Sequence, residues 1–269
     1  MGFAFHAQQP EGVLARYDLD RGKGLQTKLA RGLDEVSGLA VMGDQVFGHG
    51  DERAIVYAID LTTGGAAVAF APGERGVRGD FEGVALAEGR MVLVTSTGVL
   101  VGVRTERRGE AVPYETHRGL AARNCEVEGL EYDAPTRSLL LACKTTSGRA
   151  LRDRLVIFAY SLERMAPEAE PRHAIPLADL ERLGGGNQLH PSGIAIHPVS
   201  HTIFIVAARQ KLIVEIARDG RLLGARALPG RDHAQPEGIA FLKDGTMLIA
   251  DEGAGGRATI TRYPLRPSQ

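Results

Sequence analysis

The chain has 269 residues, with 32 Lys and Arg against 33 Asp and Glu, so its formal net charge is −1. Because no overall field recruits a polyanion, we expect no nucleic-acid partner. The sequence holds neither an apolar run of 18 residues nor a secretory signal pattern. We therefore expect no membrane span and a cytoplasmic protein as written, or a periplasmic or secreted one if a signal has been removed.

Two predicted strands come first in the chain. Residues 13–19, VLARYDL, and residues 25–33, LQTKLARGL, look like a third and a fourth strand that have no first and second strand before them. The abundance of Gly, with 34 residues, and the absence of Trp favour many short strands joined by tight turns.

An internal repeat follows. Five segments start with Ser or Glu, continue with Gly and then have alternating apolar residues. We call the first residue of each segment its head; the heads are Ser37, Glu82, Glu128, Ser192 and Glu237. The spacing is 45 or 46 residues, except for one interval of 64. Each head is followed by a second and a third apolar run and then by a weaker fourth, which is typical of a four-stranded blade.

The repeat predicts an all-β chain that forms one closed β-propeller over residues 1–269. The repeat count indicates five blades, with six as the alternative; a β-sandwich is the competing fold, but it does not need the same dipeptide at every fourth strand. The last copy runs out of chain after its third strand, so residues 13–33 are expected to complete it and to remove an exposed edge. The long interval indicates an insertion at about 161–190, with a short helix over 177–183 and Gly184–Gly186 as a hinge.

The repeat segments resemble the SdiA-regulated (YjiK-like) family of bacterial β-propellers. The resemblance rests on GDFEGVAL, CEVEGLEYD followed by LLLACK, HPSGIAIHP and QPEGIAFLKDGTMLIADEG, and it covers residues 33 to 263. It implies a propeller fold, frequent export to the cell envelope and no established reaction. The chain is also distantly similar to calcium-dependent propeller lactonases and propeller phytases, but it matches none of their catalytic motifs.

Strand alternation places the candidate site at one mouth of the channel. The five heads ring this mouth, and the ends of the second strands add Asp51, Ser96, Lys144, Ala208 and Glu252 just outside them. Glu82, Glu128 and Glu237 repel one another there, so we expect either that one of them keeps a proton or that a cation lies among them, and calcium suits these oxygen ligands better than zinc. The alternative is that each carboxylate clips its blade to the next one by accepting backbone N–H bonds.

Departures from the repeat add a basic flank to this mouth. Lys144 replaces an acid or Ser, Arg149, Arg152 and Arg154 follow it, and Arg209 and Lys211 lie at the matching place in the fourth copy. We expect an anionic small molecule or a protein as ligand and a monomeric chain; ordinary solvated loop charges are the alternative. The insertion could cover this mouth as a lid, or it could be a surface decoration.

No nucleophile–base pair or cofactor motif is found. His49, His117 and His190 are candidates for acid–base work, but none has a visible partner. Cys125 and Cys143 are expected to be free thiols, although both lie near Glu128 and could form a disulfide. Two functions remain open: a ligand-binding propeller without catalysis, and a metal-dependent hydrolase of lactones or phosphoesters that uses the axial carboxylates.

Overall fold

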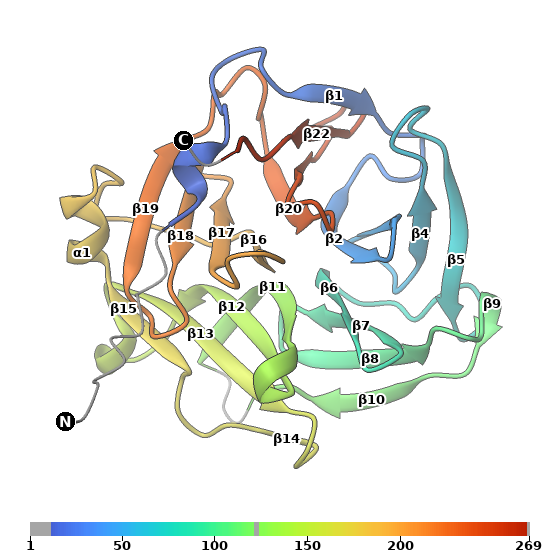
Figure 1. The fold of residues 1–269 in the computed structure, drawn as a ribbon. Helices are drawn as coiled ribbons and strands as arrows, with labels where there is room; N and C mark the ends of the chain where they lie inside the picture. The colour runs from blue at the N-terminus through green and yellow to red at the C-terminus, as the bar shows by residue number, and fades with distance from the viewer. Residues whose placement is uncertain (1–11, 121–123, 268–269) are drawn as a thin grey trace, which may run out of the picture.

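The computed structural model describes residues 12–120 and 124–267, which form five sheets arranged around one axis (Figure 1). The innermost strands are β2 (Val36–Met42), β6 (Phe81–Ala87), β11 (Cys125–Asp133), β16 (Gly193–Ile196) and β20 (Pro236–Phe241). Each contacts the next around the full circle, β20 with β2 included. The prediction of a five-bladed propeller is confirmed, and the alternatives of six blades and of a sandwich are excluded.

The other strands follow the order that the repeat predicts. The second strands are β3 (Gln45–Gly50), β7 (Arg90–Thr95), β12 (Ser138–Thr146), β17 (Ile203–Ala207) and β21 (Met247–Asp251). The third strands are β4 (Val56–Ile59), β8 (Val99–Arg104), β13 (Arg154–Ser161), β18 (Leu212–Ile216) and β22 (Thr259–Tyr263). The outermost are β5 (Ala66–Pro72), β10 (Glu115–Arg118), β14 (Ala166–Pro167), β15 (His173–Pro176), β19 (Leu222–Ala227) and β1 (Leu25–Lys28), while β9 (Gly109–Val112) adds to β5 in parallel. We number the blades 1 to 5 in the chain order of their inner strands.

The N-terminal segment closes the ring, as predicted. Strand β1 pairs antiparallel with β22 and becomes the outer strand of blade 5. Residues 13–19 are not a strand, however: they hold the 3-10 helix η1 (Leu14–Arg16). Leu14 and Tyr17 are both buried against blades 4 and 5, and a spacing of three residues suits a helical turn rather than an alternating strand.

The repeated glycine serves the close approach of inner strands. A Cβ atom added to Gly83 would lie 2.6 Å from the backbone N of Leu130, and one added to Gly193 would lie 2.8 Å from the carbonyl O of Glu237. Neither distance leaves room for a side chain. The five glycines therefore form a narrow waist in the central channel, where the remaining cavity measures only about 10 Å³.

The insertion completes blade 3. Strands β14 and β15 both pair with β13, and the predicted helix is α1 (Leu177–Arg182). Leu177 and Leu180 of α1 are buried in the cluster between blades 3 and 4, and the helix contacts β15 and β19. It therefore lies at the outer rim of the ring (Figure 1), not over the channel. No helix in the described residues is long and apolar enough to cross a membrane.

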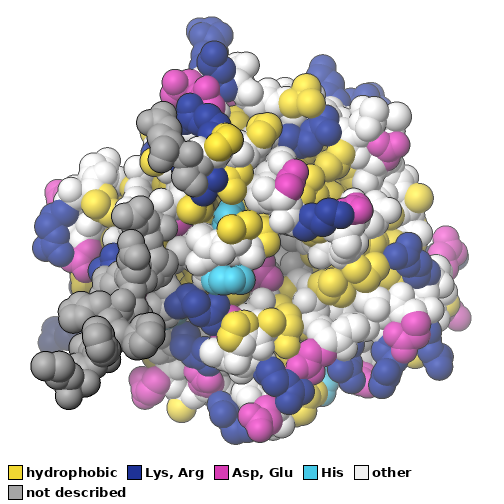
Figure 2. All heavy atoms as spheres, in the orientation of Figure 1, with side chains coloured by type: hydrophobic (Ala, Val, Ile, Leu, Met, Phe, Trp, Pro, Cys, Tyr) yellow, Lys and Arg dark blue, Asp and Glu magenta, His cyan; other side chains and the backbone are white. Residues whose placement is uncertain are grey.

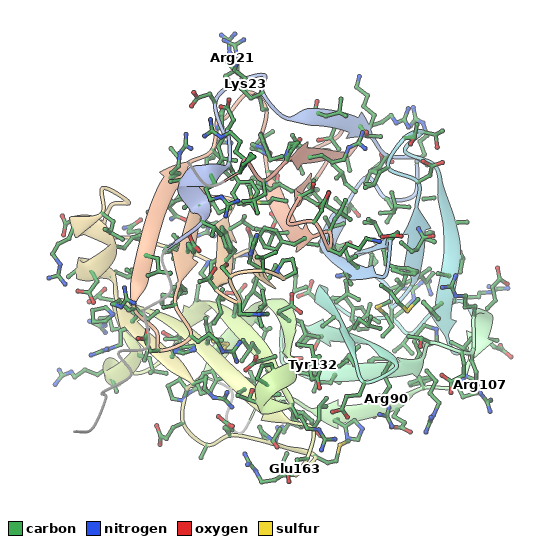
Figure 3. The ribbon with its side chains drawn as sticks, viewed as in Figure 1. Arg21, Lys23, Arg90, Arg107, Tyr132 and Glu163 are labelled. Carbon is green, nitrogen blue, oxygen red and sulfur yellow. A yellow bond between two sulfur atoms is a disulfide. The ribbon has the colours of Figure 1, made fainter. Side chains whose placement is uncertain are left out.

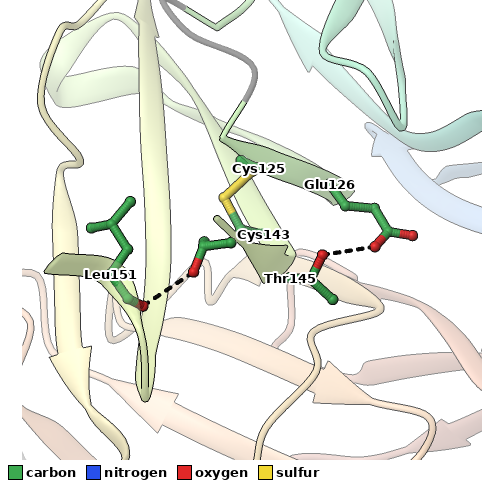
Figure 4. The surroundings of a disulfide bond; sticks show 6 residues. Cys125, Glu126, Cys143, Thr145 and Leu151 are labelled. Atoms are coloured by element: carbon green, nitrogen blue, oxygen red, sulfur yellow. Dashed lines mark hydrogen bonds between the residues drawn. A yellow bond between two sulfur atoms is a disulfide. The ribbon is translucent and has the colours of Figure 1, made fainter. Parts of the chain in front are cut away.

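The two cysteines form a disulfide, so the prediction of free thiols is wrong (Figure 4). Cys143 of β12 pairs across the ladder with Val127, and the register of β11 shifts between Glu126 and Val127. This irregularity brings Cys125 to a Cα–Cα distance of 5.4 Å from Cys143. The strand pattern indicated that the two residues are near each other, but it did not indicate the shift that aligns their side chains.

Candidate functional site

The two ends of the channel differ in the residues that surround them. At the mouth face the inner strands begin and the second strands end; at the turn face the first strand of each blade turns into the second. Figure 3 looks onto the turn face, where the labelled Arg90 and Tyr132 lie. The predicted site belongs to the mouth face, on the far side of this view.

A pocket of about 380 Å³ lies at the mouth face between blades 3, 4 and 5. It brings together five of the predicted site residues, namely Glu128, Lys144, Ser192, Arg209 and Glu237. We call it the mouth pocket. Its lining also includes His190, Lys211 and Gln235, so three cationic side chains and two carboxyls face one space.

Glu128 and Lys144 form the central ion pair of the mouth pocket. The Lys144 Nζ donates to Glu128 Oε1 at 2.7 Å, and the Glu128 side chain is almost fully buried. Burial raises the pKa of Glu128, and the Lys144 hydrogen bond offsets part of that rise. Burial alone would lower the pKa of Lys144, but its bond to Glu128 and the nearby acids raise it. An ammonium group thus already lies among the acids of the mouth.

The other two channel acids hold protons more tightly than ordinary carboxyls. Burial, and then the charge on Glu128, raises the pKa of Glu82 to about 9 and that of Glu237 to about 7. Glu82 is therefore neutral at pH 7, and Glu237 titrates near it. Since Glu128 perturbs both groups, the repulsion among three acids that the sequence predicts is present.

Arg209 and Lys211 supply the basic side of the mouth pocket. Lys211 donates to the carbonyl oxygens of Ala234 at 2.6 Å and His233 at 3.3 Å, which fixes its position. Arg209 is exposed, and no ion pair joins it to another described residue. Its guanidinium donors are therefore available to a ligand.

Ser192 and His190 hold the blades together at this mouth. Ser192 Oγ donates to the Pro236 carbonyl of blade 5 at 2.6 Å, and the ring Nδ1 of His190 lies 3.1 Å from the Lys144 carbonyl of blade 3. Ser192 thus links blade 4 to blade 5 by donating to a carbonyl, which differs from the predicted clip, in which a carboxylate accepts a backbone N–H. For the three repeated glutamates, no bond to a backbone N–H of the next blade is found in the described part of the chain.

The remaining predicted residues lie apart from the mouth pocket. Asp51 lines a separate hollow of about 400 Å³ at blade 1, together with Glu35, Glu52 and Arg53. Ser37 Oγ donates to the Glu35 carbonyl at 3.3 Å.

Two more parts of the predicted mouth do not line the mouth pocket themselves. Glu252 accepts a hydrogen bond from Gln235. Arg149, Arg152 and Arg154 are absent from the described lining of the mouth pocket, and Arg154 Nη1 donates to the Ala174 carbonyl at 2.8 Å. The basic flank therefore comes from Lys144 and blade 4 alone.

Of the other two candidate histidines, neither lines the mouth pocket. His49 is fully buried, and burial lowers its pKa to about 4, so it is neutral at pH 7. Its Nδ1 contacts the Gly50 carbonyl, and its Nε2 has no hydrogen-bond partner among the described residues. His117 lies on the outer strand β10, 3.8 Å from Glu115.

Sequence reasoning missed two groups of residues, except for His190, which it named only as an acid–base candidate. The residue two places before each head is polar in all five copies, namely Glu35, Asp80, Glu126, His190 and Gln235; extending the repeat by two positions would have found them. The second group is buried: the ring of His233 lies 2.7 Å from Asp251 Oδ2 and 2.7 Å from Tyr263 Oη. This network orients the loop whose carbonyls hold Lys211, and no repeat marks it.

The arrangement of acids bears on the calcium hypothesis. Among the described residues, no group of three or more His, Cys, Asp or Glu side chains is placed to hold a metal ion. Lys144 Nζ lies at hydrogen-bond distance from Glu128, where a bound cation would compete with it. The carboxylate oxygens are of the type calcium prefers, but their spacing is not that of a formed site.

Comparison with known proteins supports the fold and part of the resemblance. A family model described as SdiA-regulated matches residues 172–263, which confirms the resemblance over that stretch, less than half of the chain. No curated protein matches the chain.

Several solved structures share the fold at low sequence identity. A streptogramin B lyase matches with a TM-score of 0.55 and 11% identity over 89% of this chain and 97% of its own. A glutaminyl cyclase from Myxococcus xanthus matches with a TM-score of 0.57 and 13% identity, over 90% of this chain and 96% of its own. A gluconolactonase from Xanthomonas campestris matches with a TM-score of 0.52 and 12% identity, over 90% of both chains. These similarities show a propeller fold and nothing finer.

Proposed function

We propose that this propeller binds a small anionic ligand in the mouth pocket. The observation that carries the proposal is the convergence of Lys144, Arg209 and Lys211 on one space of about 380 Å³. Lys144 and Lys211 are fixed by their own partners, whereas Arg209 has donors to offer.

The chemistry of the lining suits a carboxylate or a phosphate. A guanidinium presents a planar pair of donors that matches either group, and the lysines add positive charge beside it. Burial raises the pKa of Glu237 to about 7, so its neutral carboxyl can donate a hydrogen bond to the same ligand. A ligand in this pocket can form charge-assisted hydrogen bonds with the basic side chains, and Ser192 lies in the same lining.

Calorimetric titration with succinate and inorganic phosphate as probes tests this proposal. We expect saturable binding of at least one probe and a loss of about tenfold or more in affinity in Arg209→Ala, the size of a lost charged hydrogen bond. Arg221→Ala is the matched control, because Arg221 is an exposed arginine of blade 4 at the turn face. If neither probe binds, or if Arg209→Ala binds as the unchanged chain does, the proposal fails.

The metal-dependent hydrolase is a separate hypothesis, and it depends on calcium among Glu82, Glu128 and Glu237. Melting curves with calcium and with a chelator test it, because a cation that binds only the folded chain raises the melting temperature by mass action. Lys144→Met removes the competing ammonium, so a calcium response should be larger in this variant. If neither protein responds, calcium has no place in the site.

A further inference from the structure

Below the glycine waist, the channel widens into a second cavity of about 190 Å³. The second halves of all five inner strands line it, so we call it the vestibule. The inner strands pair on one side only, and their free backbone edges face this space. The turn face, drawn as spheres in Figure 2, is hollowed at its centre, where the vestibule lies.

One residue of the vestibule breaks the repeat. Two positions after the repeated glycine, four blades carry alanine, at Ala40, Ala85, Ala195 and Ala240, and blade 3 carries Glu131. Among the described residues that line the vestibule, Glu131 is the only one with a charged side chain. The other four blades form the same fold with alanine at this position, and Glu131 is not among the residues that line the mouth pocket.

The contacts of Glu131 leave its negative charge without a counter-ion. Oε1 accepts the backbone N–H of Tyr132 at 2.6 Å, and Oε2 accepts that of Ile196 of blade 4 at 3.1 Å. Both donors are neutral, and each carboxylate oxygen can accept a further hydrogen bond. No ion pair joins Glu131 to another described residue, so the charge is left for a cation from outside the chain.

We propose that the vestibule binds a small organic ammonium ion, whose charged head pairs with Glu131 and whose short alkyl chain lies against the apolar side chains around it. The apolar part of the wall comes from residues such as Leu86, Ile196 and Phe241. The volume exceeds that of a few water molecules and suits a chain of about four carbons. The site is independent of the mouth pocket, because the glycine waist separates the two.

Titration with n-butylammonium chloride at pH 8 tests the proposal. This pH keeps Glu131 ionised, since burial raises its pKa to about 7. We expect saturable binding, and a loss of about tenfold or more in Glu131→Gln, which keeps the shape but removes the charge. n-Butanol and butyrate should not bind at this site, and succinate should not compete.

Two further variants separate a ligand site from a purely structural carboxylate. Glu131→Ala installs the residue of the other four blades and should abolish butylammonium binding even if the fold is kept. Glu163→Gln changes an exposed acid of the turn face outside the vestibule, labelled in Figure 3, and should bind as the unchanged chain does. The absence of saturable binding, or equal binding in Glu131→Gln, would overturn the proposal whatever the result at the mouth pocket.

Discussion

Equivalent residues of this repeat have different environments, and their chemistry differs accordingly. Glu82, Glu128 and Glu237 head three blades, yet only Glu128 has an ammonium partner. Burial and the negative charge on Glu128 both disfavour the ionised form of Glu82, and they raise its pKa. The electrostatics of the mouth thus depend on the one blade that carries Lys144.

The raised pKa of Glu82 gives a pH dependence with a definite sign. Burial and Glu128 raise this pKa from 4.5 to about 9, so the folded chain holds the proton more tightly than the unfolded chain. Stability contributed by this proton is present below pH 4.5 and is lost as pH rises toward 9. Glu82→Gln has nothing to deprotonate, so it should melt higher than the unchanged chain at pH 9, by about 2–4 °C for each kcal/mol relieved. At pH 5 the difference should shrink; a constant difference at both pH values would contradict the assignment, and Glu163→Gln serves as the exposed control.

At the scale of elements, the sequence predicted the strands that recur in every blade, but it did not predict features that depend on the conformation of single loops. The five inner strands start within a few residues of Ser37, Glu82, Glu128, Ser192 and Glu237, because close packing of the inner strands demands the same glycine in every blade. The residues that line the mouth pocket were predicted in part, since strand alternation places Lys144 and Glu128 together. The separation of Asp51 into another hollow depends on loop conformation, which no periodicity encodes.

The glycine waist makes a prediction that concerns packing alone. Gly83→Ala would place a Cβ atom 2.6 Å from the backbone N of Leu130, and a neighbouring strand cannot yield as a flexible side chain can. We expect a loss of about 1–3 kcal/mol or more in the free energy of unfolding, measured by denaturant titration. Gly102→Ala is the control, because the atom nearest to its added Cβ lies 4.0 Å away. Equal losses in the two variants would show that the waist is not tightly packed.

The disulfide joins β11 to β12 beside the ion pair of the mouth pocket. It closes a segment with a sequence separation of 18, and a link of this size stabilises a fold by about 3 kcal/mol in the chain-entropy account. Alkylation of the denatured chain without reductant should add no mass, whereas two alkyl groups should be added after reduction. Reductant should also lower the melting temperature, but not in the double variant Cys125→Ala and Cys143→Ala. Labelling without reductant would show free thiols instead.

At the scale of the whole molecule, the ring is closed by segments from both ends of the chain. β1 pairs with β22, and Arg266 N donates to the Arg16 carbonyl at 3.2 Å. The buried carboxylate of Glu215 accepts the backbone N–H groups of Val13 at 2.9 Å and Leu14 at 2.7 Å, which fixes the segment before β1 to blade 4. Closure therefore pairs the free edge of β22 and also gives the buried carboxylate of Glu215 two backbone N–H donors.

This closure predicts that the N-terminal segment can act in trans. A chain of residues 34–269 lacks β1, so the edge of β22 is free to pair with another chain, and the Glu215 carboxylate loses two donors. We expect this chain to melt lower and to associate, as measured by thermal denaturation and light scattering. A synthetic peptide of residues 12–33 should restore both properties, because main-chain hydrogen bonds to a sheet edge and the Glu215 contacts can form between separate chains. A scrambled peptide of the same composition is the control. If the shortened chain stays monomeric with an unchanged melting temperature, the four blades and the incomplete fifth are stable without closure, and the pairing of β1 with β22 contributes little to the fold.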